Sequence, residues 1–184
     1  MLRELKSYST LAEKAITNIS VCTAIAEREL SRGQTVGLEM KDGLLFATPQ
    51  VGNRARGVAT IDAKRDEDVG VTEVKGIVKL QIGTVTVLRV PGIGKGGSRN
   101  VDLARLRAEV KGRLFIGALG IEAQVALKRL KLDFHRYGVR EATIEAAYCG
   151  LQPAAVCVEG ELSGFIKRLE EADIDYKIVD IARN

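Results

Sequence analysis

The sequence predicts an α/β protein in which a β-rich part precedes a parallel-type open sheet flanked by helices. From about Ile82 to Ile181, apolar runs typical of buried strands alternate with segments whose apolar residues recur at helical spacing. Between residues 19 and 82 the chain instead shows short strand-like segments separated by turn residues. We therefore predict a connecting helix over residues 1–18, a β-rich subdomain (small barrel or sandwich) over 19–82 and an α/β ligand-binding subdomain over 83–184.

The N-terminal helix is predicted from a single apolar stripe. Tyr8, Leu11, Ala12 and Ala15 fall at the spacing of one helical face. The segment has no clear N-cap and begins directly with charged residues, so we expect it to continue from an upstream element.

The β-rich subdomain is predicted from turn chemistry. Segments 35–40 and 44–48 flank Asp42-Gly43, and Asp-Gly between two apolar runs is a strong hairpin signal. Ser31–Leu38 also resembles Lys64–Val71, because in each a polar turn leads into a Val-Gly strand. Such an echo is expected of repeated hairpins in a small barrel or sandwich. The other predicted strands of this region are 19–25, 58–61, 69–74 and 76–80.

Strands and helices alternate through the rest of the chain. The predicted strands are 84–90, 114–118, a short one at 133–137, 154–158 and 176–181. Leu103, Leu106 and Val110 mark the first helix, with Asn100 or Asp102 as its cap. This alternation predicts parallel strands joined by crossover helices that cover both faces of the sheet.

Composition excludes several classes of protein. Hydrophobic residues make up 46% of the chain and charged residues 28%, as in an ordinary globular protein. Aromatic residues reach only 4%, which disfavours a stacking platform for single-stranded nucleic acid. A net charge of +4, from 28 basic and 24 acidic residues, predicts a mixed solvated surface rather than a nucleic-acid groove. There is no signal peptide and no apolar run of membrane-spanning length, so we expect a cytoplasmic protein with no membrane contact.

The residue types that usually carry metal or nucleophilic chemistry are sparse. Cys22, Cys149 and Cys157 form no CxxC pair, and with the lone His135 they make a poor zinc set. A single histidine also leaves no nucleophile-and-base arrangement to argue for. We expect no metal, no cofactor and no catalytic residues.

The strongest candidate for a ligand site is the glycine-rich loop Gly92–Ser98. In open α/β sheets ligands bind beyond the carboxyl ends of the strands, and this loop follows the first predicted strand. Its glycines let the backbone approach a ligand closely, while Lys95 and Arg99 add positive charge. Residues after the strands give the full candidate set: Gly94, Lys95, Gly96, Gly97, Ser98, Arg99, Asn100, Gly117, Gly120, Glu122, Tyr137, Glu141 and Glu159.

Other interpretations of these residues remain open at this point. The loop could be a flexible linker between the β-rich region and the sheet. Gly92, Gly94 and Gly97 match a dinucleotide fingerprint, but Lys111 stands where its acidic residue is expected, which argues against a nicotinamide cofactor. The carboxylates could bind an amine or a metal, or only complement the helix dipoles.

Four segments together resemble the C-terminal region of archaeal winged-helix, MarR-like transcriptional regulators. They are Ser31–Leu38, Gly57–Lys64, Pro91–Asp102 and Glu141–Ala147. The resemblance implies an effector-binding domain, with DNA contacted only through a winged helix that this sequence lacks. It also implies that the N-terminal helix connects to that missing domain, and it is compatible with a homodimer.

The predicted function is therefore the sensing of a small anionic metabolite at the C-terminal strand edge, within a transcriptional regulator. An alternative is a small metabolic enzyme or transferase on the same α/β scaffold. A third is a structural or partner-binding module.

Overall fold

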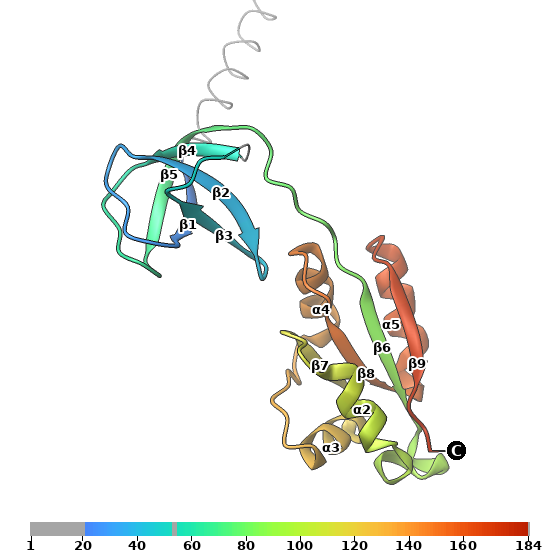
Figure 1. The fold of residues 1–184 in the computed structure, drawn as a ribbon. Coiled ribbons are helices and arrows are strands. Elements are labelled where there is room, and N and C mark those ends of the chain that lie inside the picture. Colours follow the sequence, from blue (N-terminus) through green and yellow to red (C-terminus); the bar gives the residue numbers. More distant parts are fainter. Residues whose placement is uncertain (1–20, 53–54, 184) are drawn as a thin grey trace, which may run out of the picture. The chain divides into compact units, whose positions relative to one another are not determined.

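The protein is represented by a computed structural model that describes residues 21–52 and 55–183 (Figure 1). The chain divides into two compact units, Met1–Lys79 and Leu80–Asn184. The predicted helix over residues 1–18 lies outside the described residues.

The first unit contains a closed five-stranded barrel in the order β1-β3-β2-β4-β5. β1 pairs parallel with β3 and antiparallel with β5, and the remaining neighbours are antiparallel. Small and β-branched side chains fill the interior, with Val36, Val69 and Val71 fully buried. The strands are β1 (Cys22–Ala26), β2 (Thr35–Lys41), β3 (Leu44–Thr48), β4 (Ala55–Ala59) and β5 (Asp68–Lys75).

The hairpin predicted around Asp42-Gly43 is confirmed. β2 and β3 pair antiparallel up to the Lys41–Leu44 pair, which leaves a two-residue loop. Asp42 and Gly43 both have positive φ, 50° and 81°. A two-residue turn with two positive φ angles matches the right-handed twist of the strands it joins.

The barrel consists of two halves that repeat each other along the chain. β4 begins as many positions after β1 as β5 begins after β2. Leu30 and Ala63 are separated by the same interval, and each donates its backbone N–H to the carbonyl of the other, at 2.8 and 3.0 Å. The echo between Ser31–Leu38 and Lys64–Val71 is thus a structural repeat.

The turn that precedes each Val-Gly strand is built in the same way in both halves. The N–H of Gly33 donates to the carbonyl of Ala59, and the N–H of Asp66 donates to the carbonyl of Ala26, each at 2.8 Å. Both turn residues have positive φ, 80° for Gly33 and 67° for Asp66. Aspartate tolerates this left-handed conformation better than most residues, which explains why the second half manages without a glycine.

The strand predicted over residues 76–80 is wrong. By the interval of the repeat this segment is the counterpart of β3, yet it leaves the barrel in an irregular path. Gly76, with φ of 91°, turns the chain at the end of β5. Whereas β3 lies between β1 and β2, β4 and β5 pair directly with each other, so no position remains between them for another strand.

The second unit is an α/β structure built on a four-stranded parallel sheet in the order β7-β8-β6-β9. The prediction of a parallel sheet flanked by helices is confirmed. The two central strands, β6 and β8, are the most completely buried, as expected for strands covered on both faces. The strands are β6 (Val85–Val90), β7 (Ile116–Leu119), β8 (Ala154–Val158) and β9 (Tyr176–Asp180).

The short strand predicted over residues 133–137 is present only as a single bridge. His135 exchanges two 2.9 Å hydrogen bonds with the edge strand β7, and its ring stacks on Phe115 at 4.7 Å. Gly138, with φ of 62°, then turns the chain into the next helix before a ladder can extend.

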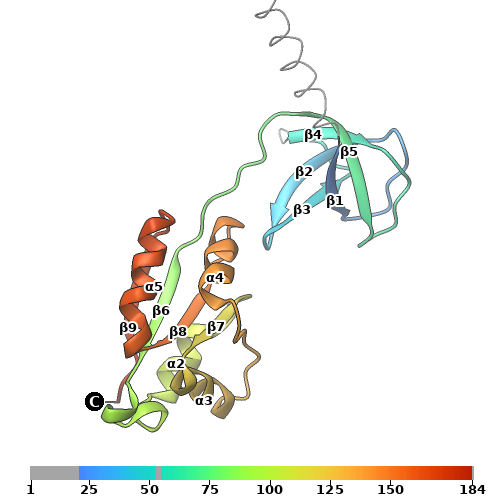
Figure 2. The ribbon, with the colours of Figure 1, turned by 180° about the vertical axis from the view of Figure 1, so that it is seen from behind.

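Two helices cover each face of the sheet (Figures 1 and 2). α2 and α3 pack over one face with Leu106 and Leu127, while α4 and α5 pack over the other with Ile144 and Phe165. The Asp102 side chain accepts a 3.0 Å bond from the Arg105 N–H, so Asp102, not Asn100, caps α2. The helices are α2 (Leu103–Val110), α3 (Ile121–Arg129), α4 (Val139–Tyr148) and α5 (Glu159–Glu171).

Candidate functional site

The candidate site lies at the carboxyl ends of the adjacent central strands β6 and β8. The chain leaving β6 goes to α2 on one face of the sheet, and the chain leaving β8 enters α5 on the other. Neighbouring strands whose connections part to opposite faces open a crevice between their ends, and open α/β sheets bind ligands there.

The glycine-rich loop follows β6 and has a regular turn structure. It forms two 3₁₀ turns, Ile93–Lys95 and Gly97–Asn100. The carbonyl of Gly92 accepts from two backbone N–H groups further along the loop, at 2.9 and 3.1 Å. The linker interpretation is wrong, because the loop lies within the α/β unit and not between the two units.

Two further contacts fix the second turn of the loop. The Asn100 side-chain amide donates to the carbonyl of Lys95 at 3.2 Å, and Arg129 of α3 donates to the carbonyl of Ser98 at 2.7 Å. Gly96 has φ of 92°, and a Cβ there would lie 3.0 Å from the Cβ of Asn100. The glycines therefore allow a tightly closed loop, whose outer side remains exposed at Gly94, Lys95 and Arg99.

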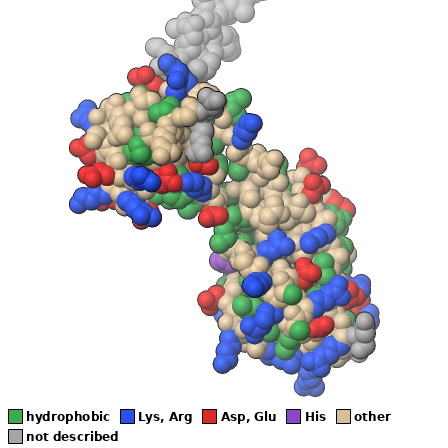
Figure 3. All heavy atoms as spheres, in the orientation of Figure 1, with side chains coloured by type: hydrophobic (Ala, Val, Ile, Leu, Met, Phe, Trp, Pro, Cys, Tyr) green, Lys and Arg blue, Asp and Glu red, His purple; other side chains and the backbone are tan. Residues whose placement is uncertain are grey.

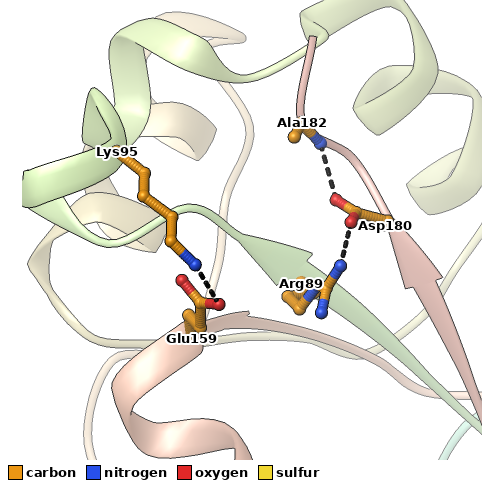
Figure 4. Close-up of polar contacts among 5 residues, drawn as sticks. All are labelled: Arg89, Lys95, Glu159, Asp180 and Ala182. Atoms are coloured by element: carbon orange, nitrogen blue, oxygen red, sulfur yellow. Dashed lines mark hydrogen bonds and ion pairs between the residues drawn. The ribbon is translucent and has the colours of Figure 1, made fainter. Parts of the chain in front are cut away.

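An ion pair joins this loop to the start of α5 (Figure 4). Lys95 Nζ lies 2.7 Å from Glu159 Oε1. The hydrogen bond from Lys95 is the main reason that the pKa of Glu159 is lowered, and the Gly92 backbone amide lowers it further. Glu159 is thus held as a carboxylate, although both side chains remain partly open to solvent.

A second ion pair joins β6 to β9 beside the first (Figure 4). Arg89 and Asp180 are register partners in the sheet, and their side chains form a hydrogen-bonded ion pair. Asp180 also accepts from the Ala182 N–H at 2.9 Å. The Arg89 guanidinium lowers the pKa of Asp180, and that carboxylate raises the pKa of Arg89.

The start of α3, which follows β7, lies beside the same strand ends. Gly120 has φ of 92°, and a Cβ there would lie only 2.3 Å from Val158 Cγ1 at the end of β8. Glu122, in the first turn of α3, packs next to the loop, since its Cγ would lie 3.4 Å from a Cβ at Gly97. The structure thus brings Lys95, Gly97, Gly120, Glu122 and Glu159 together.

Three predicted residues lie elsewhere in the unit or have another role. Gly117 is buried within β7, where a Cβ would lie 2.4 Å from Val139 Cγ1, so it permits close helix packing. Tyr137 is 85% exposed in the loop before α4. Glu141 makes two 2.8 Å hydrogen bonds to Arg168 of α5, beside a hollow of about 560 Å³ that both residues line.

The sequence prediction missed Arg89, Arg129 and Asp180. Arg89 is the only charged residue in β6, and Asp180 ends the last strand of the sheet. The rule that placed Glu159 in the site, which selects residues at strand ends, would have selected Asp180 had it been applied to that strand. Nothing in the local sequence indicates the bond from Arg129, because it depends on how α3 packs against the loop.

The described residues give no sign of a metal centre or a membrane span. In residues 21–52 and 55–183, no three His, Cys, Asp or Glu side chains are placed to hold a metal ion. Within the same ranges, none of the helices combines the length and apolar character that crossing a bilayer requires.

Comparison with known proteins identifies relatives of this chain. Residues 79–178, more than half of the chain, match the family described as "Domain of unknown function (DUF7839)". The uncharacterized protein MJ0558 of Methanocaldococcus jannaschii is 31% identical over 186 residues, which cover 99% of this chain and 71% of that protein. A solved structure titled "Crystal structure of an hypothetical protein" aligns with 12% identity over 90% of this chain and 85% of its own. Its TM-score is 0.23, too low to support any statement about the fold.

Proposed function

We propose that the α/β unit binds a small anionic metabolite at the carboxyl ends of β6 and β8. The chain belongs to the DUF7839 family, whose description names no ligand, so the proposal rests on the site itself. The observation that carries the proposal is the ion pair between Lys95 and Glu159, which joins the loop after β6 to the start of α5 where the connections of two adjacent strands part. The match to this family covers almost the whole α/β unit and none of the barrel strands.

The charges around the crevice favour an anion. Lys95 is neutralised by Glu159, and Arg89 by Asp180. Arg99 is exposed on the loop and makes no ion pair with any described residue. An arriving phosphate or carboxylate would meet Arg99 first and could then draw Lys95 away from Glu159, because both cations lie on one short loop.

The wider role that we propose is that of an effector-binding domain in a transcriptional regulator. It rests on the resemblance of four segments of the sequence to MarR-like archaeal regulators. The relative in Methanocaldococcus jannaschii is longer than this chain, which covers 71% of its length. A domain that reports a metabolite needs binding without turnover.

Thermal unfolding in the presence of inorganic phosphate or pyrophosphate tests the site. A ligand that binds only the folded protein stabilises it by about 2.7 kcal/mol at a concentration one hundred times its Kd. We expect saturable stabilisation of the wild-type chain. Replacing both cations of the loop, Lys95→Ala and Arg99→Ala, should abolish it.

A control variant with the same change in charge is available within the same unit. Lys167→Ala with Lys177→Ala removes two exposed cations of α5 and β9 and should keep the stabilisation. Equal loss in both double variants, or full stabilisation of the loop variant, would show that the anion does not bind at this loop.

A further inference from the structure

The charge of the α/β unit is divided between two consecutive parts of its sequence. Residues 89–136 contain eleven Lys or Arg and four Asp or Glu, whereas residues 137–183 contain five basic and nine acidic residues. The first part supplies α2 and α3 and the second supplies α4 and α5, so the two faces of the sheet carry opposite net charge.

Eight of the eleven cations of the first part form a surface that we name the α2–α3 basic face. All of its members are exposed and none makes an ion pair with another described residue. Figure 3 shows Lys and Arg side chains gathered over this part of the α/β unit. The members are Arg99, Arg105, Arg107, Lys111, Lys128, Arg129, Lys131 and Arg136.

On the opposite face, most cations of the helices form ion pairs with carboxylates. Arg140 pairs with Glu161, Arg168 makes a bidentate contact with Glu141, and Lys167 lies near Glu171. Arg113 belongs to residues 89–136 but not to the basic face, because it is half-buried and donates to two carbonyls and to the Thr86 hydroxyl. Three of the five cations in residues 137–183 therefore have a carboxylate partner, whereas the members of the α2–α3 basic face make no ion pair with a described residue.

A surface of eight cations without carboxylate partners among the described residues repels itself and attracts polyanions. We propose that the α2–α3 basic face binds the phosphate backbone of double-stranded nucleic acid. Five of its eight cations are arginines, whose planar guanidinium matches phosphate oxygens in a bidentate manner.

The exposed residues of α2 and α3 favour a nucleic-acid duplex over a single strand or a membrane surface. Neither α2 nor α3 contains an aromatic residue on which the bases of a single strand could stack. On α2 the exposed residues are two alanines and two arginines, and α3 exposes only Ile121 and Val125 as large apolar side chains. The face thus lacks the broad apolar stripe with which a helix enters an anionic bilayer. Contacts to phosphates alone predict binding that depends little on base sequence.

Fluorescence anisotropy of a labelled DNA duplex of about 20 base pairs, titrated with the full chain, tests the proposal. The slope of log K against log salt is about −0.9 for each phosphate contact. Neutralising Arg105, Arg107, Lys111 and Lys128 to Gln should make this slope shallower by about 3 to 4 and weaken binding at least tenfold at about 50 mM salt. All four residues lie outside the glycine-rich loop, so this result is independent of the anion site proposed above.

A second quadruple variant separates the face from the net charge of the chain. Lys64, Arg65, Lys167 and Lys177 are exposed cations of the barrel, α5 and β9, and changing them to Gln removes the same total charge. This variant should retain at least half of the wild-type affinity. Circular dichroism checks that both variants remain folded.

Three results would overturn the proposal. The wild-type chain could fail to bind the duplex at about 50 mM salt, although nonspecific binders are readily detected there. The two quadruple variants could lose affinity equally, which would assign binding to net charge. Lastly, the chain could bind vesicles containing phosphatidylserine but not the duplex, which would assign the face to a membrane.

Discussion

At the scale of single residues, the site is organised by two ion pairs that lie side by side at the strand ends. Lys95 and Glu159 belong to segments 64 residues apart, and Arg89 and Asp180 to segments 91 residues apart. Both carboxylates have a lowered pKa because a cation donates a hydrogen bond to each. The local electrostatics of the site can therefore be measured by titration.

We predict that Lys95→Ala raises the pKa of Glu159 towards the ordinary value of about 4.3. In the folded wild type this pKa is lowered, so the ion pair stabilises the fold above the pKa of the unfolded chain. That stabilisation is lost as pH falls through the lowered pKa of the folded state. Carboxyl-detected NMR titration of the two proteins gives the measurement.

Glu141 supplies the internal control for this titration. Its pKa is also lowered, but by Arg168, so it should not change in Lys95→Ala. An unchanged pKa for Glu159 in the variant would mean that Lys95 does not hold that carboxylate in solution.

Half of this residue-scale site could be predicted from the sequence. Lys95 and Glu159 follow from the rule that ligands meet residues just beyond parallel strands, once the strands are recognised as buried apolar runs. Arg89 and Asp180 face each other only because β6 and β9 are neighbours in register. That adjacency is set by the packing of the whole unit and leaves no local pattern.

At the scale of elements, the position of α3 depends on the close approach of its first residues to β8. Gly120 has a φ of 92°, and a Cβ added there would lie 2.3 Å from Val158 Cγ1. A side chain at this position is strained in its backbone and also overlaps the end of the strand.

We predict that Gly120→Ala lowers the free energy of unfolding by about 2 to 4 kcal/mol, the sum of backbone strain and overpacking. Urea unfolding of the variant and the wild type measures the difference. Gly94→Ala is the matched control, because a Cβ at Gly94 meets nothing within 4 Å and its φ is not positive. Its effect should stay within about 1 kcal/mol, and a loss as large as that of Gly120→Ala would contradict the explanation.

Strands and helices whose apolar residues recur at a clear period were predicted well, and the two wrong strands both lack a partner over several residues. Residues 76–80 find no open strand edge in the barrel, whereas residues 133–137 reach the edge strand β7 but form only one bridge before Gly138 turns the chain. A strand needs a neighbouring strand to pair with as well as a high β-propensity, and the sequence shows only the propensity.

At the scale of the whole molecule, the chain consists of two units with separate cores. The buried residues of the barrel form one cluster, and the two clusters of the α/β unit lie on either side of its sheet. The division of charge between the two faces of the α/β unit also belongs to this scale. The net charge of +4 does not reveal this division, because the sequence alone does not show which helices share a face.

We predict that the two units unfold separately. Val87→Ala, which opens a cavity among fully buried side chains of the α/β unit, should destabilise that unit by about 2 kcal/mol or more. The barrel should keep its own unfolding midpoint. Hydrogen exchange followed by mass spectrometry reports the two units by their peptides, and a parallel loss of protection in β1–β5 would contradict independent unfolding.

The internal repeat of the barrel has a consequence for how its halves meet. When Leu30 and Ala63 bond to each other through equivalent groups, the two halves are related by a local two-fold axis that passes between these residues. An isologous homodimer interface shows the same self-complementary contact, so the two halves of the barrel meet as two subunits of such a dimer would. The symmetry fails at β3, whose counterpart leaves the barrel after Gly76. The connection to the α/β unit is thus made from the residues that a fully symmetric barrel would have used as its sixth strand.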